Sequence, residues 1–442
     1  MRKFFYILFG FLALLCTGCD NSGTSTTLSS VAKLSAFSFA AADSMPGLAK
    51  AVFTIEERLD TGLVWNQDSI LYGTSLKRVV PRFTFAATPS ASSLIMPDTT
   101  CRLTGYDTLD FSKGPIYLYI RSADKSTSKV YEIRPTVHQV DPDLYSWTLL
   151  NDGIYAPDDS EQRVVELGDL FVMIVSNGFA LHTYCSAEGI DWLDLGYPIG
   201  LPEGTRVRQI ISDGTTLYYG QGNAIYTSTD AIHWTAHSVS EKVVTMLLYW
   251  NDEVWALTVQ DEQYELAVYE DGELLLTGLK PDHAFPVSDF AAVTFTSASG
   301  RDRAMIVGGF AENGQSLNTR WNLEYADYFS DGAYRLEEFS INRPQFTSLT
   351  GISIIWYNNQ LLLFGGVDDK MTYIGRDILI SDNEGLTWTP ADSTKNRLPD
   401  VYQARQKQNA IVRDNYIYLF GGQTSQTTFS DVFCGRLNSI DW

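Results

Sequence analysis

The chain is poor in basic residues and in residues that commonly bind metals. Its 442 residues include 32 Lys and Arg against 53 Asp and Glu, which gives a formal net charge of −21, and they include five His and five Cys. No basic run offers counterion release to phosphates, so the charge works against nucleic acid binding. The lack of a polybasic surface also argues against peripheral attachment to anionic lipid.

The apolar run at the N-terminus is too short to span a membrane. It covers residues 4–16, follows a positive start, and suits the core of a signal peptide. The sequence then reads Thr-Gly-Cys and resembles the lipobox of bacterial lipoproteins, in which the cysteine is diacylated and becomes the mature N-terminus. The resemblance implies a signal peptide over 1–19, lipidation at Cys19 and a place at the bacterial outer membrane, facing the periplasm or the surface. An ordinary secretory signal cut nearby is the alternative, and residues 20–30, rich in Ser, Thr and Gly, predict a flexible tether.

The remaining cysteines give no disulfide framework. Removal of the leader and lipidation of Cys19 leave Cys101, Cys185 and Cys434, an odd number with no CxxC pair and no zinc-binding spacing. Cys185 and Cys434 occupy similar points of the first and last repeats described below, where we expect them to lie beyond the disulfide limit of about 7 Å between Cα atoms. We interpret all three as small buried apolar residues.

What the chain does have is a repeat of about 40–55 residues, a period typical of propellers and solenoids. Three copies carry a strand that ends in a glycine pair, reading AMIVGG at 304–309, LLLFGG at 361–366 and IYLFGG at 417–422. We count six units between 145 and 442. Their inner strands are predicted to begin near Leu170, Leu217, Val254, Ala304, Leu361 and Ile417.

Several units also contain a turn that ends in tryptophan. The copies read SAEGIDW at 186–192, STDAIHW at 228–234, SDNEGLTW at 381–388 and NSIDW at 438–442, and they end in Trp192, Trp234, Trp388 and Trp442. They resemble the Asp-box of sialidase-type propellers, which has a structural role. In such a turn an acid or amide side chain accepts hydrogen bonds from backbone N–H groups, glycine supplies a positive φ, and the Trp packs into the blade.

Residues 31–140 lack this repeat. Their short strands of alternating apolar and polar residues predict a small antiparallel sandwich. The hairpin that turns over residues 122–129 resembles the last two strands of immunoglobulin-like (Ig-like) modules, which act as spacers near the membrane.

The doubled glycines resemble those of kelch repeats, where close backbone approach is the expected reason for glycine. The whole plan resembles an uncharacterised family of Bacteroidetes lipoproteins. This implies an all-β chain with a small antiparallel Ig-like sandwich over 31–140 and a six-bladed kelch-type β-propeller over 145–442. A seven-bladed ring with residues 145–149 in an extra unit is the alternative, but we expect that strand to close the ring by joining the last blade.

Motifs of common catalytic sites are missing. The chain has no GxSxG elbow, no P-loop and no dinucleotide fingerprint. The arginine set and Arg-Ile-Pro-type motif of sialidases are not seen, and the histidines do not resemble the copper ligands of galactose oxidase. These are His138, His182, His233, His237 and His283. We therefore predict no catalytic residue, no cofactor and no metal site.

A binding surface is the remaining candidate for function. The loops after the glycine pairs, 310–319, 367–375 and 423–430, are polar and should cluster on one face. The candidate ligand-binding residues are Arg320, Trp321, Tyr325 and Arg405. Trp and Tyr can stack on sugars, Arg is enriched at protein hot spots, and Arg405 is a candidate to face the channel. The alternatives are that Trp321 belongs to the blade core and that Arg405 is an ordinary solvated turn residue.

Together these features predict a lipid-anchored cell-envelope protein whose propeller binds a glycan or an envelope protein, as a monomer or within a surface complex. One alternative is a carbohydrate-active enzyme, a hydrolase or lyase that uses carboxylates on the propeller face. Another is a structural subunit with no ligand of its own. Three clustered arginines or two close carboxylates at the channel mouth would favour the enzyme, and a flat aromatic patch would favour binding.

The lipid anchor can be tested directly. In a suitable bacterial host, Cys19→Ala should move the protein from the membrane to the soluble fraction and abolish incorporation of radiolabelled palmitate, because the thiol that accepts the lipid is gone. Membrane attachment that persists in this variant would contradict the prediction.

Overall fold

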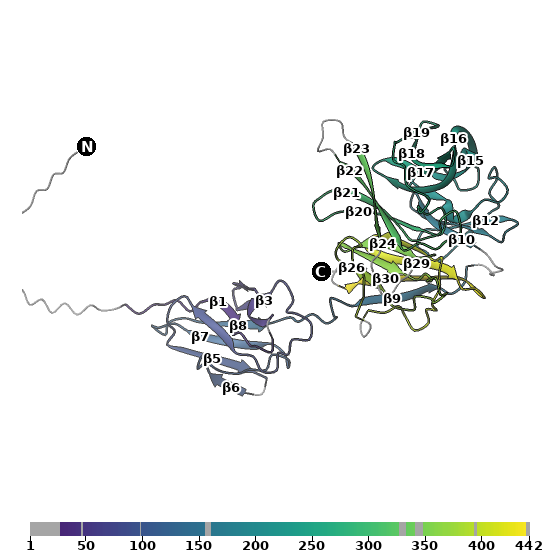
Figure 1. Cartoon of the computed structure of the whole chain (residues 1–442). Coiled ribbons are helices and arrows are strands. Elements are labelled where there is room, and N and C mark those ends of the chain that lie inside the picture. Colours follow the sequence, from purple (N-terminus) through teal and green to yellow (C-terminus); the bar gives the residue numbers. More distant parts are fainter. Residues whose placement is uncertain are drawn as a thin grey trace, which may run out of the picture. The chain divides into compact units, whose positions relative to one another are not determined.

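The computed structural model describes residues 27–45, 47–97, 99–154, 161–326, 333–340, 348–392 and 396–438. In these residues the chain is all-β apart from two single-turn 3-10 helices, η1 (Leu48–Lys50) and η2 (Val207–Gln209). It divides into two compact units, residues 1–141 and 142–442, which we call the N-terminal domain and the propeller (Figure 1). Across the described ranges, no helix has the length and apolar character needed to cross a membrane.

The N-terminal domain consists of a two-stranded ladder, β1-β4, and a six-stranded sheet in the order β2-β3-β8-β7-β5-β6. Its strands are β1 (Leu34–Phe39), β2 (Phe53–Glu56), β3 (Thr61–Asn66), β4 (Pro81–Phe85), β5 (Ala91–Met96), β6 (Thr99–Arg102), β7 (Ile116–Arg121) and β8 (Ser128–Arg134). The predicted hairpin is β7-β8, whose antiparallel register places Ile116 opposite Ile133.

The prediction of a purely antiparallel sandwich was wrong in one pair of strands. β3 and β8 run parallel, with Thr61 opposite Val130. A parallel pair needs a long connection between its strands, and the 61 residues between Asn66 and Ser128 supply it. The alternation of apolar and polar residues along a strand does not reveal the direction of its neighbour, so this pairing has no local signal.

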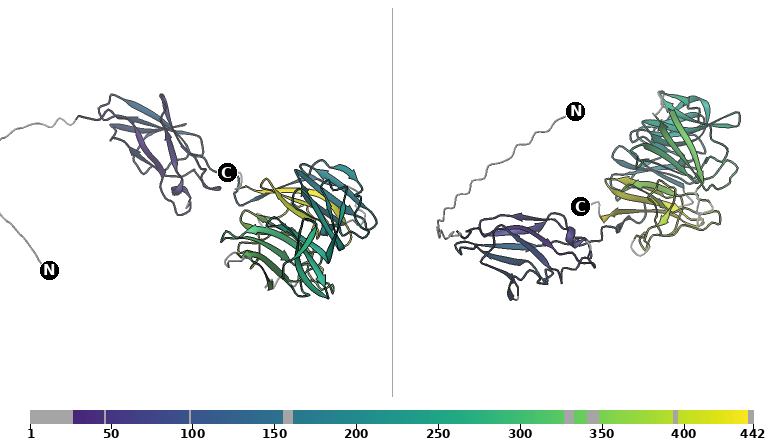
Figure 2. Two further views of the ribbon diagram at one scale, coloured as in Figure 1. Left: turned by 90° about the horizontal axis from the view of Figure 1, so that it is seen from above. Right: turned by 60° about the vertical axis from the view of Figure 1, so that its left-hand side comes forward.

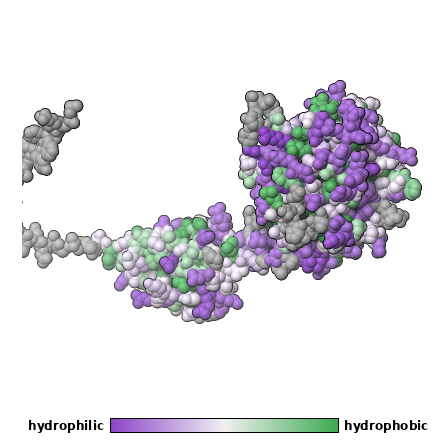
Figure 3. All heavy atoms as spheres, in the orientation of Figure 1, coloured by the Kyte–Doolittle hydropathy of each residue, from purple (hydrophilic) through white to green (hydrophobic). Residues whose placement is uncertain are grey.

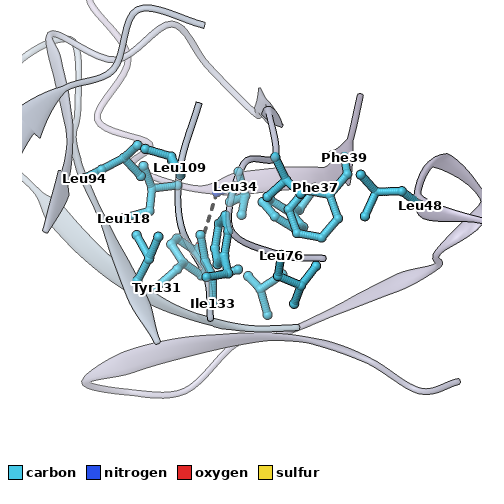
Figure 4. Close-up of a cluster of buried hydrophobic side chains, with 14 of the residues drawn as sticks. Leu34, Phe37, Phe39, Leu48, Leu76, Leu94, Leu109, Leu118, Tyr131 and Ile133 are labelled. Carbon is cyan, nitrogen blue, oxygen red and sulfur yellow. Dashed lines mark hydrogen bonds between the residues drawn. The ribbon is translucent and has the colours of Figure 1, made fainter. Parts of the chain in front are cut away.

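A single apolar core joins the ladder to the sheet, which makes the domain a sandwich. Leu34, Phe37 and Phe39 of β1 lie in the same cluster as Leu118 of β7 and Tyr131 of β8 (Figure 4). The backbone N–H of Leu34 donates to the Tyr131 hydroxyl at 3.2 Å, the bond drawn dashed in Figure 4. Burial raises the pKa of Tyr131 to about 12, so this hydroxyl stays protonated at neutral pH.

The propeller contains four four-stranded sheets and one six-stranded sheet. Its strands are β9 (Tyr145–Asn151), β10 (Glu161–Leu167), β11 (Leu170–Ser176), β12 (Leu181–Ser186), β13 (Leu193–Gly196), β14 (Ile211–Ser212), β15 (Leu217–Ser228), β16 (Thr235–Trp250), β17 (Glu253–Gln260), β18 (Gln263–Glu270), β19 (Glu273–Leu276), β20 (Ala291–Thr296), β21 (Asp302–Val307), β22 (Thr319–Ala326), β23 (Ala333–Ser340), β24 (Ser353–Tyr357), β25 (Gln360–Phe364), β26 (Leu379–Ser381), β27 (Thr389–Pro390), β28 (Asn409–Arg413), β29 (Tyr416–Gln423) and β30 (Thr428–Leu437).

These sheets make six units. Unit 1 is β10–β13, unit 4 is β20–β23, unit 5 is β24–β27, and unit 6 is β28–β30 with β9. Units 2 and 3 share the six-stranded sheet because β16 serves both. Its residues 235–238 pair with β15, and its residues 242–250 pair with β17.

Each pair of neighbouring units shares one apolar cluster, and the six clusters form a closed ring. The ring closes between units 6 and 1, where Phe420 and Val432 pack with Val164 and Met173. As expected, β9 joins the last blade, pairing antiparallel with β30. Figure 2 shows the blades from two further directions.

The strands predicted to be innermost stand second in each unit. The strands that line the channel come before them, as β10, β14, β16, β20, β24 and β28. The second strand has both edges paired and both faces covered by neighbouring units, so it is the most apolar strand of its unit. The innermost strand has one edge on the channel and tolerates polar residues.

The glycine pairs are explained by close approach, as predicted. Gly308, Gly365 and Gly421 all have positive φ, and a Cβ on Gly308 would lie 2.2 Å from the carbonyl oxygen of Leu349 in the connection to unit 5. At Gly365 the nearest atom would be the carbonyl oxygen of Arg405 at 2.7 Å. The first glycine of each pair therefore lets the backbone lie against the next unit.

The tryptophan turns have the predicted hydrogen bonds. The Asp230 carboxylate accepts the N–H groups of Ile232 and His233 at 2.9 and 2.7 Å, and Asn383 accepts the Thr387 N–H at 2.8 Å. Burial alone would raise the pKa of Asp230, but these bonds outweigh it and lower the pKa well below its usual range. Trp234 and Trp388 pack into the interface with the preceding unit, Trp192 is half-buried, and Trp442 lies outside the described residues.

The visible face of the propeller is largely hydrophilic, with scattered apolar residues (Figure 3).

The three cysteines of the described chain form no disulfide bond. Cys185 is buried, while Cys101 and Cys434 are half-buried, which is less than the full burial expected for all three.

Trp388 should contribute strongly to propeller stability because it is 2% exposed in the interface between units 4 and 5. We expect Trp388→Ala to lower the free energy of unfolding by about 3–5 kcal/mol, measured by chemical denaturation. The matched control is Trp192→Ala, at the equivalent but half-buried position, which should cost clearly less. Equal losses would show that burial of the box tryptophan does not set its contribution.

Candidate binding site in the propeller channel

A cavity of about 790 Å³ lies in the propeller channel. All six units contribute to it, through residues within 161–166, 206–214, 246–249, 288–294, 352–354 and 408–411. Its volume falls in the range of about 300–1,000 Å³ that is usual for sites of small ligands. The cavity is therefore the candidate site.

Four charged side chains link units across the start of the innermost strands. Asp289 accepts from Arg208 Nε at 3.1 Å through Oδ1 and from Lys407 Nζ at 3.2 Å through Oδ2. Lys407 Nζ also lies 3.0 Å from Glu161 Oε1. We call Glu161, Arg208, Asp289 and Lys407 the ionic belt. They come from the starts of units 1, 2, 4 and 6. Two of the contacts join units that are not neighbours, Arg208 of unit 2 with Asp289 of unit 4 and Asp289 with Lys407 of unit 6.

Backbone conformation places the belt. Asp289, Gly351 and Lys407 each stand two residues before an innermost strand and have φ values of 49°, 61° and 58°. The Lys407 N–H donates to the Gly351 carbonyl at 2.6 Å, and the Gly351 N–H donates to the Asp289 carbonyl at 3.0 Å. Arg208 Nη1 adds a bond to the Lys407 carbonyl at 2.7 Å. This chain of hydrogen bonds makes a rigid neck at one end of the channel.

The far ends of the innermost strands carry a second polar group. Arg413 Nε donates to Glu166 Oε1 at 2.7 Å, and its guanidinium lies 3.5 Å from the ring centre of Phe171, joining unit 6 to unit 1. Tyr218 donates to Asp213 Oδ2 at 2.7 Å. Burial would raise the pKa of Asp213, but the bonds from Tyr218 and from the Thr215 and Thr216 amides lower it, so this carboxylate is charged at neutral pH.

Arg163 is a basic residue of the cavity wall that lacks a carboxylate partner in the described structure. Its Nε donates to the Ile210 carbonyl at 2.9 Å, and this is its one hydrogen bond to the described residues. Arg163 is half-buried in the cavity wall. Its burial is the main cause that lowers the pKa of Arg163 to about 10, and the nearby positive charge of Arg208 adds to it. The group remains protonated at neutral pH, so a positive charge with no acidic partner among the described residues lines the cavity.

Three of the four predicted ligand-binding side chains are buried and already engaged. Arg320 is 3% exposed, donates to the Glu384 carbonyl in the box turn of unit 5, and lies 4.6 Å from the ring centre of Phe339. Trp321 is 6% exposed and packs on Phe285, as the blade-core alternative expected. Tyr325 is 42% exposed.

Arg405 is 1% exposed and does not line the cavity. It is paired with Asp431, with 3.0 Å between Nη2 and Oδ2, and donates to the Gly421 carbonyl at 2.9 Å. Its guanidinium stacks 3.8 Å from the ring centre of Phe429. These contacts fasten the connection before unit 6 to the strands of that unit, which is a structural role.

The histidines are dispersed. His182 contacts Asp194 at 2.6 Å, His233 contacts Asp230 at 2.7 Å, and His237 contacts Thr227 at 2.9 Å. No group of three or more His, Cys, Asp and Glu side chains that could hold a metal ion occurs among the residues described above.

Sequence reasoning missed Arg163 and the ionic belt. The belt residues are of different types and come from different units, so no motif joins them. The one shared signal is their place just before the innermost strands, which becomes visible only once those strands are identified.

Two family models match the chain. The DUF6242 N-terminal domain, described as a domain of unknown function, matches residues 25–134, and the DUF6242 beta propeller domain matches residues 141–442. No curated protein matches. Among solved structures the chain is similar to one titled "Structure of YjhT", with a TM-score of 0.46 and 12% identity, over 64% of this chain and 96% of that chain.

Asp289 should be the central residue of the ionic belt because both belt cations contact it. Asp289→Asn leaves Arg208 and Lys407 short of negative charge in a partly buried site, and we expect a loss of about 3 kcal/mol in unfolding free energy by denaturant titration. Asp302→Asn, at an exposed site in unit 4, is the control. If both variants are equally stable, the belt does not stabilise the ring.

Proposed function

The chain belongs to the DUF6242 family, and on this premise we propose that it is a lipid-anchored cell-envelope protein whose propeller binds a glycan in its channel. In this proposal Cys19, which lies outside the described residues, anchors the protein at the bacterial outer membrane, with the N-terminal domain as an Ig-like spacer. The glycine pairs and their close approach to the next unit favour the kelch type of propeller. The same proposal includes that the proteins of this family are lipoproteins of Bacteroidetes.

The single observation that carries the binding function is the polar cavity lined by all six units. A concave site of this volume suits a sugar or a short oligosaccharide, whose hydroxyls need donors and acceptors in the wall. A protein partner would instead need about 800 Å² of surface on each side. A channel does not present such a surface, so a glycan is the better match than an envelope protein.

Three arginines in the wall, Arg163, Arg206 and Arg208, favour a second candidate, an enzyme acting on a carboxylated sugar. The Arg208 guanidinium already donates hydrogen bonds to Asp289 and to the Lys407 carbonyl, so it is not available to bind the carboxylate of a substrate. We therefore prefer binding without catalysis.

Blocking the channel tests the proposal. Thr294 is exposed on β20 and lines the cavity, whereas Thr296 is exposed two residues further along the same strand and does not. On a glycan array, the chain from residue 20 onward should bind at least one glycan, and Thr294→Trp should weaken that binding at least tenfold because the indole projects into the channel and takes space from the ligand. Thr296→Trp should bind as wild type.

Failure to bind any glycan, or unchanged binding by Thr294→Trp, would contradict the proposal. Release of reducing sugar from a bound glycan, abolished by one Asp or Glu substitution in the propeller, would favour the enzyme. A pull-down of an envelope protein that Thr294→Trp leaves intact would favour the protein partner.

A further inference from the structure

We infer that the ligand of the channel carries a carboxylate group and that Arg163 holds it. This inference rests on the proposed binding function and names the class of ligand, an acidic sugar with a single negative charge. It comes from the pairing of charges around the cavity.

Three of the other basic residues around the cavity are already matched with acids, while Arg206 is exposed to solvent. Arg208 is paired with Asp289, Lys407 with Asp289 and Glu161, and Arg413 with Glu166. Arg163 differs because its one bond within the described structure is to the Ile210 carbonyl. The chain has 53 acidic residues, yet none of the described ones pairs with this guanidinium. An unpaired charge removed from bulk water is costly, and an anionic ligand would offset that cost.

The charge balance favours a monoanion. The belt contains two cations, Arg208 and Lys407, and two anions, Glu161 and Asp289, so it is neutral. Arg413 cancels Glu166 at the far end, and the wall residues Arg206 and Asp213 cancel each other, so Arg163 leaves one positive charge in excess. A phosphate monoester brings a charge of about −1.5 to −2 at neutral pH and would leave an excess. A carboxylate brings one, as a sulfate ester also does, and only the carboxylate presents a planar pair of oxygens that matches the planar guanidinium fork.

A second unpartnered group in the wall suits the neutral part of a sugar. Asn409 on β28 is 4% exposed, lines the cavity, and neither its amide oxygen nor its amide nitrogen has a partner in the described chain. The adjacent Gln408 has an unpartnered Nε2. Buried amides are almost always hydrogen-bonded, so these groups point to a missing partner. These amide atoms have almost no exposed surface, so the Asn409 side chain would have to turn toward the channel before a sugar hydroxyl, which both donates and accepts, could serve it.

The test uses the chain from residue 20 onward on an array of glycans ending in neutral sugars, uronic acids, sialic acids, sulfate esters or phosphate esters. Carboxylated glycans should give the dominant signal, and Arg163→Met should weaken it at least tenfold. The matched control is Arg335→Met, which removes the same charge from an exposed residue of β23 that does not line the cavity. It should change binding less than threefold.

Thermal unfolding supplies a readout that needs no ligand. Arg163→Met should melt no lower than wild type, because it removes an unpaired charge, whereas Arg208→Met should melt lower because it breaks the belt. If Arg163→Met lowers the melting temperature as much as Arg208→Met does, Arg163 has a structural role and the inference is overturned.

The remaining outcomes separate this inference from the proposed function. If the chain binds only neutral, sulfated or phosphorylated glycans and Thr294→Trp blocks this binding, the inference of a carboxylated ligand is contradicted. The proposed glycan-binding function is then still supported. Equal losses of glycan affinity in Arg163→Met and Arg335→Met would reduce the effect to general electrostatics and overturn the role of Arg163. No binding to any glycan would overturn both.

Discussion

The propeller depends on closure of the ring. Each unit buries its apolar faces only against its two neighbours, so an open ring would leave two faces in water. Several contacts close the ring within unit 6 and between units 6 and 1. β9 pairs with β30, Phe420 and Val432 pack on unit 1, and Arg413 reaches Glu166 and the ring of Phe171 in unit 1. A strand from before the repeats thus completes the unit at their end, which fixes both ends of the propeller chain in one sheet.

Closure also creates the polar channel. The innermost strand of each unit has an edge without a partner strand, so the side chains beside it can be polar at little cost. At one end these strands follow residues in the left-handed conformation, Asp289, Gly351 and Lys407, and the resulting turn brings side chains of distant units within reach of one another. The ionic belt is therefore a consequence of ring geometry. Its two cations and two anions compensate one another in a site that is only partly exposed to water.

The architecture was largely readable from the sequence, whereas the site was not. The glycine pairs and the tryptophan turns repeat because every interface between units makes similar demands, and Gly308 meets Leu349 much as Gly365 meets Arg405. The order of strands within a unit was misjudged because apolar content marks the strand covered on both faces, which stands second. The parallel pairing of β3 and β8 was missed because it joins segments far apart in the chain.

The candidate site shows why residue type is a weaker guide than pairing. Trp321 and Arg405 have side chains suited to binding, yet one fills an interface and the other is surrounded by Asp431, Gly421 and Phe429. Arg163 carries no sequence signal, since it is a single arginine on a strand. It becomes distinctive only by comparison with Arg208, Lys407 and Arg413, whose acidic partners come from other units. The interfaces between units stabilise the ring enough to tolerate the Arg163 guanidinium without an acidic partner among the described residues. Because this charge does not stabilise the fold, a ligand in the channel is the best explanation for it.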